Sequence, residues 1–191
     1  MINLLGHKYY TEEDLRKMGF KSLGIDIRIG TKATIRDPSI VTIGNHVAID
    51  DFVMIAPTTD IGNYVHISRF TSIAGPIECY CKLDDFSGIS ERCSLICGSE
   101  DYSGDHLTNP TIPHKFRKII TGKIIMEKYS LLGTNVVVAP NVIIGEGTAV
   151  GACSFVNKTL APWGIYFGIP AIRKKERSKK MIEAAKQLEG I

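Results

Sequence analysis

MEKYSL LGTNVV VAPNVI IGEGTA VGACSF VNKTLA, residues 126–161, is a run of six consecutive blocks of six residues. Each block opens with an apolar residue, and its fifth position is Ser, Thr, Val or Leu. The second position is small in four blocks, at Gly133, Ala139, Gly145 and Gly151. A period of six matches neither a helix, with about 3.6 residues per turn, nor a lone strand, with a period of about 2. It is typical of a parallel β-helix, in which each block forms one flat face of a triangular coil.

The same period extends towards the N-terminus. Blocks open at Ile29 and Ile35, and six isoleucines at six-residue spacing follow from Ile43 to Ile73. After a phase slip near Cys79 the pattern resumes at Leu83, Ile89 and Leu95. We expect each slip to be a bulge or corner loop. The seventeen blocks predict between five and six coils, with the opening aliphatic side chains stacked in the interior.

The segments around the repeat predict three parts. Residues 1–22 are expected to cap the N-terminal end with a short helix, because Thr11 and Asp14 have the spacing of a capping box. Residues 23–161 form the β-helix, with a loop insertion at about 101–125, and residues 162–191 form a turn and a basic helix from about Ala171. The insertion contains two prolines and lacks the period, so we expect an extruded functional loop.

Composition excludes several classes of function. The net charge of +3 is too small to indicate nucleic-acid binding, and no apolar run reaches the about 18 residues of a membrane span. Five cysteines and a polar N-terminus argue against a disulfide framework, so we expect a cytoplasmic protein. The cysteines at 79, 81, 93 and 97 are expected to fill interior corners and not to bind zinc.

The run IIGEGTAVGACSFVNKTLAPWGIYFGIPAIRKK resembles the C-terminal signature of the hexapeptide-repeat acyltransferases. The resemblance implies a left-handed parallel β-helix, a homotrimer with sites between subunits, and an acyl-CoA co-substrate. It places the pantetheine arm along the late coils and the turn that follows them, and the nucleotide phosphates near a basic segment. The corresponding cofactor-binding positions are Gly133, Ala139, Gly151, Gly168, Pro170, Ala171, Arg173 and Lys174.

Members of this family differ in their acceptor. Many carry Ser-His-Asp-Tyr at the start of the loop, with the His as general base. Here the segment is Ser99-Glu100-Asp101-Tyr102. A hydroxyl acceptor needs a base during attack, whereas an amine has its own lone pair once it is deprotonated. The resemblance is therefore closest to the N-acyltransferases of nucleotide-linked, dTDP-type amino-dideoxy sugars in surface polysaccharide pathways.

Glu100, Asp101 and His106 are the candidate catalytic residues, and His66, Ser87 and His114 are the candidate acceptor-binding residues. Glu100 and Asp101 could steer an ammonium group or take a proton. Three alternatives stay open: O-acetylation of a sugar with His106 or His114 as base, a zinc-dependent carbonic-anhydrase-like protein, and a scaffold without CoA binding.

Overall fold

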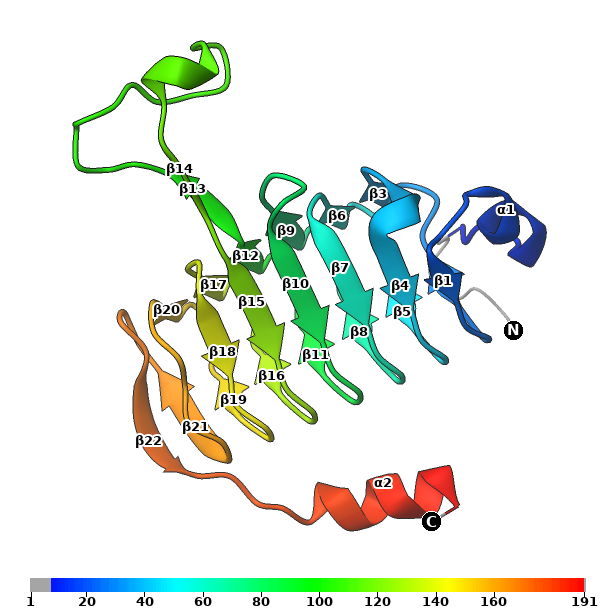
Figure 1. The fold of residues 1–191 in the computed structure, drawn as a ribbon. Coiled ribbons are helices and arrows are strands. Elements are labelled where there is room, and N and C mark those ends of the chain that lie inside the picture. Colours follow the sequence, from blue (N-terminus) through cyan, green and yellow to red (C-terminus); the bar gives the residue numbers. More distant parts are fainter. Residues whose placement is uncertain (1–7, 191) are drawn as a thin grey trace.

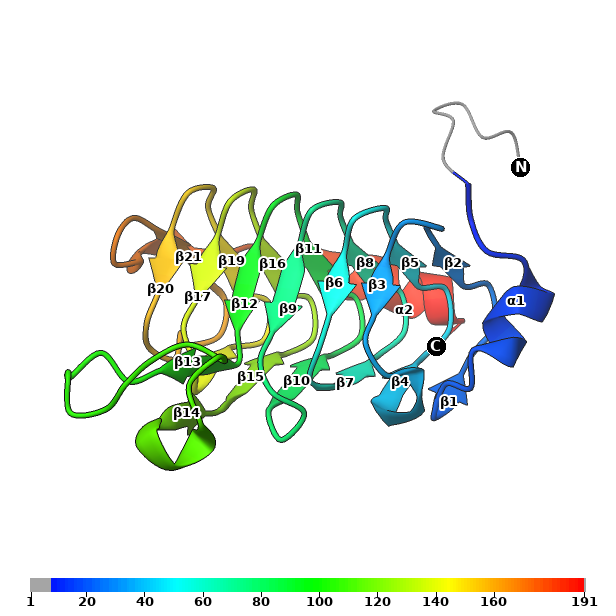
Figure 2. The same cartoon turned by 90° about the horizontal axis from the view of Figure 1, so that it is seen from above.

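The computed structural model describes residues 8–190, and the chain winds through three parallel sheets that form the faces of a prism (Figures 1 and 2). Face 1 consists of β1 (Ser22–Leu23), β4 (Val41–Ile43), β7 (Thr58–Ile61), β10 (Tyr80–Leu83), β15 (Lys123–Met126) and β18 (Val142–Ile144). Face 2 consists of β2 (Arg28–Ile29), β5 (Ala48–Ile49), β8 (His66–Ile67), β11 (Gly88–Ile89), β16 (Leu131–Leu132), β19 (Ala149–Val150), β21 (Gly164–Phe167) and β22 (Ile172–Glu176). Face 3 consists of β3 (Thr34–Ile35), β6 (Met54–Ile55), β9 (Ser72–Ala74), β12 (Ser94–Ile96), β17 (Val137–Val138) and β20 (Phe155–Val156).

The chain visits face 1, face 2 and face 3 in that order and then moves one coil along the prism. The predicted parallel β-helix is therefore confirmed. Six coils are complete and β21 begins a seventh, so the expectation of five to six coils was too low. It missed the first strand at Ser22–Leu23 and the strand beyond Ala161, because neither lies in a regular six-residue block.

The interior consists of stacked aliphatic side chains, as the repeat predicts. On face 2 the parallel register aligns the opening residues of successive blocks, and each is no more than 2% exposed: Ile29, Ile49, Ile67, Ile89, Leu132 and Val150. Burying one such side chain contributes about 1.5–3 kcal/mol. The stack is therefore the main source of stability of the coil.

A ladder of rings runs outside the core along the corner between faces 1 and 2. His46, Tyr64, Phe86 and Tyr129 stack in that order, with ring centroids 4.6, 4.9 and 5.3 Å apart, and Trp163 follows at 6.3 Å. All five residues have a backbone φ between 55° and 62°, the left-handed region that residues other than Gly rarely adopt. Ring stacking on the next coil offsets part of this backbone cost.

The N-terminal end of the prism is covered by helix α1 (Glu12–Lys17). The Thr11 hydroxyl accepts from the Asp14 amide at 3.2 Å, and the Asp14 carboxylate accepts from the Thr11 amide at 3.1 Å. Leu15 is 2% exposed and joins the core cluster. The first seven residues of the expected segment 1–22 lie outside the described residues.

The C-terminal segment differs from the prediction of a helix from about Ala171. Ile172–Glu176 is instead strand β22, which pairs antiparallel with β21, and helix α2 covers only Met181–Glu189. The open edge of face 2 offers unpaired backbone groups, and pairing with them outweighs the weak amphipathic pattern. Arg177 then fixes the tail to the ring-ladder corner by donating to the carbonyls of Tyr129 and Gly147 at 2.7 and 3.0 Å.

The loop leaves the prism between β12 on face 3 and β15 on face 1, as an antiparallel ribbon of β13 (Gly98–Glu100) and β14 (Ile119–Thr121) that carries a 3-10 turn, His114–Phe116 (Figure 1). A second 3-10 turn, Pro38–Ile40, lies between β3 and β4. No helix within residues 8–190 is long and apolar enough to cross a membrane. The four cysteines expected in the interior are buried, at Cys79, Cys81, Cys93 and Cys97.

Candidate active site

A shallow groove crosses face 2 from the first coil to the fifth. It consists of two pockets that share His66, and we call it the face-2 groove. The first pocket, of about 420 Å³, is lined by Tyr9, Arg28, His46, Ala48, Asp50, Tyr64, Val65, His66 and Arg69. The second, of about 320 Å³, is lined by His66, Ser68, Ile89, Ser90, Glu91, Leu131 and Thr134. The register explains the gathering, because the outward residues of successive face-2 strands are stacked neighbours.

The centre of the groove holds a histidine fixed by a carboxylate. His66 Nε2 lies 3.0 Å from Asp50 Oδ2, and the hydroxyl of Ser68 donates to the same oxygen at 3.3 Å. The His66 side chain is 54% exposed, so its ring reaches a ligand in the groove. When Nε2–H donates to the carboxylate, Nδ1 keeps its lone pair, and the ring is then oriented as a proton acceptor.

The groove leads to Gly133 at the corner between faces 2 and 3. A Cβ on Gly133 would lie 2.7 Å from the amide nitrogen of Ala152 on the next coil. That nitrogen has no hydrogen-bond partner among the described residues, whereas the Gly133 nitrogen itself donates to Val150 O at 2.8 Å. Because Gly133 has no side chain, the Ala152 amide stays accessible. An extended chain with amide groups, such as a pantetheine arm, could accept a hydrogen bond from it.

The other two predicted corner positions differ from Gly133. The Phe167 ring covers Gly151, where a Cβ would meet it at 1.9 Å. Ala139 lies between β17 and β18, at the corner between faces 3 and 1. A single extended arm along one corner therefore cannot contact both Gly133 and Ala139.

The predicted Gly168–Ala171 turn closes the C-terminal end of face 3. The Gly168 amide donates to the hydroxyl of Ser154 at 3.0 Å, and its carbonyl accepts from the Phe155 amide at 3.0 Å. The Ala171 amide donates to Phe155 O at 2.8 Å, and Ala171 is buried, so its side chain is not available to a cofactor. Pro170 remains exposed at the tip of the turn.

The two predicted cations of the tail are not equivalent. Arg173 Nη2 lies 2.8 Å from both carboxylate oxygens of Glu176, which compensate its charge. Lys174 is exposed and has no ion-pair partner within residues 8–190. Lys174 is therefore the better placed of the two for a free phosphate.

The predicted catalytic residues Glu100 and Asp101 lie at the base of the loop. Glu100 Oε1 accepts a short hydrogen bond from Arg117, whereas the buried Oε2 has no partner within the described residues. Asp101 accepts from the Ser103 amide at 3.0 Å and lies 2.9 Å from His106 Nδ1. These bonds, the Ser103 amide first, lower the pKa of Asp101 to about 2, so this carboxylate is a poor proton acceptor at neutral pH. His114 is exposed on the same loop, in its 3-10 turn.

Residues 123–158 match the family model described as bacterial transferase hexapeptide (six repeats). A dTDP-4-amino-4,6-dideoxy-D-glucose acyltransferase of Escherichia coli is 36% identical over 178 residues, which are 92% of each chain. This chain belongs to the hexapeptide-repeat acyltransferase family.

Two solved structures extend the comparison. AntD, an N-acyltransferase from Bacillus cereus in complex with dTDP and 3-hydroxybutyryl-CoA, matches with a TM-score of 0.93 at 38% identity, over 96% of this chain and 97% of AntD. A serine-to-cysteine mutant of AntD in complex with dTDP-4-amino-4,6-dideoxyglucose and coenzyme A has the same TM-score and identity, over 97% and 100% of the two chains. The fold and the family are thus shared along nearly the whole chain.

The predicted acceptor contact of Ser87 stays a prediction, and in this chain the Ser87 side chain is turned inward. Ser87 occupies the fifth position of its block and is 2% exposed, with a hydroxyl that has no partner within the described residues. Ser130, at the same position of a later block, is buried in the same way. The fifth positions of face 1 point inward, so a ligand outside this hexapeptide-repeat prism cannot reach them.

Sequence reasoning missed most of the groove. Asp50, Ser68 and Ser90 follow the opening isoleucines of three successive face-2 blocks, at the second position, which is Gly or Ala in four of the six late blocks. A polar residue at this position in three coils was the signal that could have identified the groove. Arg28 and Arg69 carry no such signal, because isolated arginines are common on protein surfaces.

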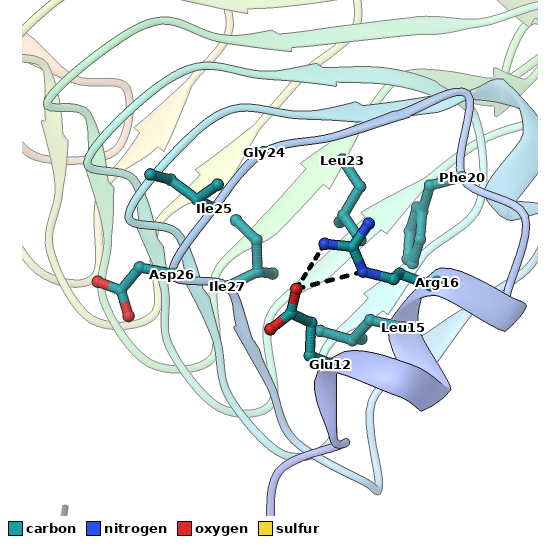
Figure 3. A pocket seen from close by; sticks show the side chains of 9 residues that line it. All are labelled: Glu12, Leu15, Arg16, Phe20, Leu23, Gly24, Ile25, Asp26 and Ile27. Atoms are coloured by element: carbon teal, nitrogen blue, oxygen red, sulfur yellow. Dashed lines mark hydrogen bonds and ion pairs between the residues drawn. The ribbon is translucent and has the colours of Figure 1, made fainter.

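A third pocket, of about 480 Å³, lies under α1 at the N-terminal end (Figure 3). Its wall is both polar and apolar, with Leu15, Phe20 and Ile27 among its apolar residues. Glu12 and Arg16 form an ion pair, with Arg16 Nη2 lying 2.5 Å from Glu12 Oε1, and the dashed lines in the figure mark it. The pocket therefore offers no unpaired group for chemistry. No three His, Cys, Asp or Glu side chains within residues 8–190 are grouped to hold a metal ion.

Proposed function

We propose that this protein transfers an acyl group from acyl-CoA to the amino group of a dTDP-linked 4-amino-4,6-dideoxy sugar for surface polysaccharide biosynthesis. The observation that carries the proposal is the near full-length similarity to N-acyltransferases whose structures contain dTDP, coenzyme A and this type of amino sugar. The face-2 groove supports it, because the groove joins a polar acceptor region to a corner where a backbone donor is uncovered.

In the proposed reaction the sugar amine attacks the thioester carbonyl in a ternary complex. A C–N bond forms, the C–S bond breaks, and the amine proton passes to His66 Nδ1. His66 then returns this proton to the departing thiolate, so that coenzyme A leaves as its thiol. The Asp50 carboxylate, 3.0 Å from His66 Nε2, holds the ring in the orientation that this transfer needs. The uncovered Ala152 amide next to Gly133 is the proposed contact for a carbonyl of the acyl-pantetheine arm.

We also propose that the enzyme is a homotrimer with its sites between subunits. The loop leaves the corner between faces 3 and 1, which in a three-sided prism lies opposite face 2. Glu100 and the face-2 groove of one chain therefore face in opposite directions. A neighbouring copy is needed to bring a loop to a groove, as in other closed cyclic assemblies.

We place the enzyme in the cytoplasm, where nucleotide sugars and CoA thioesters are made. The five cysteines are all free thiols, as is usual for proteins of a reducing compartment.

The test is thiol release from acetyl-CoA and from 3-hydroxybutyryl-CoA in the presence of dTDP-4-amino-4,6-dideoxyglucose. We expect turnover with at least one donor, and a product whose mass increases by the acyl group. The matching 4-hydroxy sugar nucleotide is the control and should not react. Absence of thiol release with either donor, or equal rates with the hydroxy sugar, would refute the proposal.

A further inference from the structure

The first pocket of the face-2 groove has a chemistry of its own. It lies on the N-terminal side of His66, on the first coils, whereas Gly133 lies on the opposite side, beyond the second pocket. Its lining combines two arginines, Arg28 and Arg69, with two tyrosine rings, Tyr9 and Tyr64. Guanidinium groups and aromatic rings side by side are the groups that bind phosphates and nucleobases.

The carboxylates around this pocket already have partners. Asp26 lies 3.0 Å from His46 Nδ1, and Asp50 lies 3.0 Å from His66 Nε2. Arg69 lines the pocket, and its Nε lies 3.0 Å from Glu91 Oε1.

Arg28 is the exception in this set. Its side chain has neither a hydrogen bond nor an ion pair within the described residues, and its Nε is buried without a partner. The hydrogen bond to His46 is the main cause that lowers the pKa of Asp26, and the nearby Arg28 charge adds to it, but Asp26 and Arg28 are not bonded. A buried guanidinium nitrogen without a partner is costly, so an anionic ligand would satisfy it.

We infer that this pocket binds the diphosphate of a nucleoside diphosphate, with Arg28 as its principal cation and Arg69 as the second. The inference rests on the proposed function, because it assigns one end of the proposed acceptor to one end of the groove. Arg28 on β2 and His66 on β8 are two strand spacings apart, about 10 Å. That span accommodates one sugar ring between the diphosphate and an amine at His66.

The experiment compares Arg28→Gln with a matched control, Arg36→Gln. Arg36 belongs to the same first coil but lies exposed after β3 on face 3, outside the pocket. Binding of dTDP, dTMP and CoA to the intact protein is measured by titration calorimetry. We expect Arg28→Gln to weaken dTDP binding about ten- to one-hundredfold, the loss expected for one or two charge-assisted bonds. CoA affinity should be unchanged, and Arg36→Gln should resemble the wild type.

A loss of affinity caused only by altered folding would affect all ligands alike. The ratio of the dTDP affinity to the dTMP affinity is therefore the quantity that tests the inference. The wild type should prefer dTDP, and Arg28→Gln should reduce this preference. If Arg28→Gln does not fold, Arg28→Lys takes its place and should show a smaller loss with the same selectivity. An Arg28 variant that is folded and binds dTDP as tightly as the wild type would overturn the inference. Failure of the wild type itself to bind dTDP or to acylate the amino sugar would instead refute the proposed function.

Discussion

Two inactive variants should restore activity to each other when they share a trimer. We expect His66→Asn, in the groove, and Glu100→Gln, at the base of the loop, each to inactivate the enzyme. If each site joins the groove of one subunit to the loop of the next, any trimer that contains both variants has one intact site of its three. We therefore expect about one third of the wild-type activity per mixed trimer, and about one quarter in an unselected equal mixture, since about a quarter of random trimers contain a single variant.

The assay uses co-expression of the two variants with different affinity tags, purification over both tags, and thiol release with saturating substrates. The matched control places two groove variants, His66→Asn and Asp50→Asn, on separate chains. Every groove in such a trimer carries a lesion, so this mixture should remain as inactive as its parents. Doubly purified His66→Asn and Glu100→Gln trimers that show no activity above their parents would refute a site between subunits. A monomeric mass of the wild type in solution would refute it as well.

Three further results are expected. Ser87→Ala should leave kcat/KM unchanged and stabilise the fold by about 1 kcal/mol in urea denaturation, because it removes a buried hydroxyl without a partner; a large loss of activity would contradict the inward orientation of Ser87. The pKa of Asp101 is lowered from about 3.8 to about 2, so the contribution of this carboxylate to loop order is present above about pH 4 and is lost as the pH falls through 2. The NMR chemical shift of the Ser103 amide should follow this titration with a midpoint near pH 2, and Asp101→Asn should abolish it. Arg177→Met should cost about 1.5–3 kcal/mol in local stability and raise hydrogen exchange in α2, whereas Arg173→Met should cost less because its ion pair is exposed.

The fold could be predicted from the sequence because the six-residue period is itself the geometry of a coil. Each opening residue from Ile29 to Val156 is tied to one interior position, and the parallel register follows from the repeat. The C-terminal tail could not be predicted in the same way. Ile172 to Glu176 has no strand period of its own, and it becomes a strand by pairing with the free edge of β21.

The site was less accessible to sequence reasoning for a physical reason. The groove is made by side chains from coils about twenty residues apart, and their adjacency depends on which face each block occupies. Phase slips near Cys79 and at the loop obscure that assignment. The inward orientation of Ser87, by contrast, follows from its fifth position in the block. The pair of Glu100 and Arg117 lies in a segment without a period, where nothing in the sequence fixes a partner.

The loop leaves the prism at the same height along its axis as Ser90 of the groove and Gly133 at its end. Ser90 lies in the fourth coil, and the loop begins from the same coil after β12 and returns at β15, the start of the coil that carries Gly133. Rotation about an axis parallel to the prism preserves height. A threefold axis would therefore bring the Glu100 loop of one subunit to the level between Ser90 and Gly133 of its neighbour, where the amine and the thioester are proposed to meet. The position of the insertion is therefore compatible with the proposed cyclic trimer, and moving the loop by one coil should abolish catalysis while the β-helix itself stays intact.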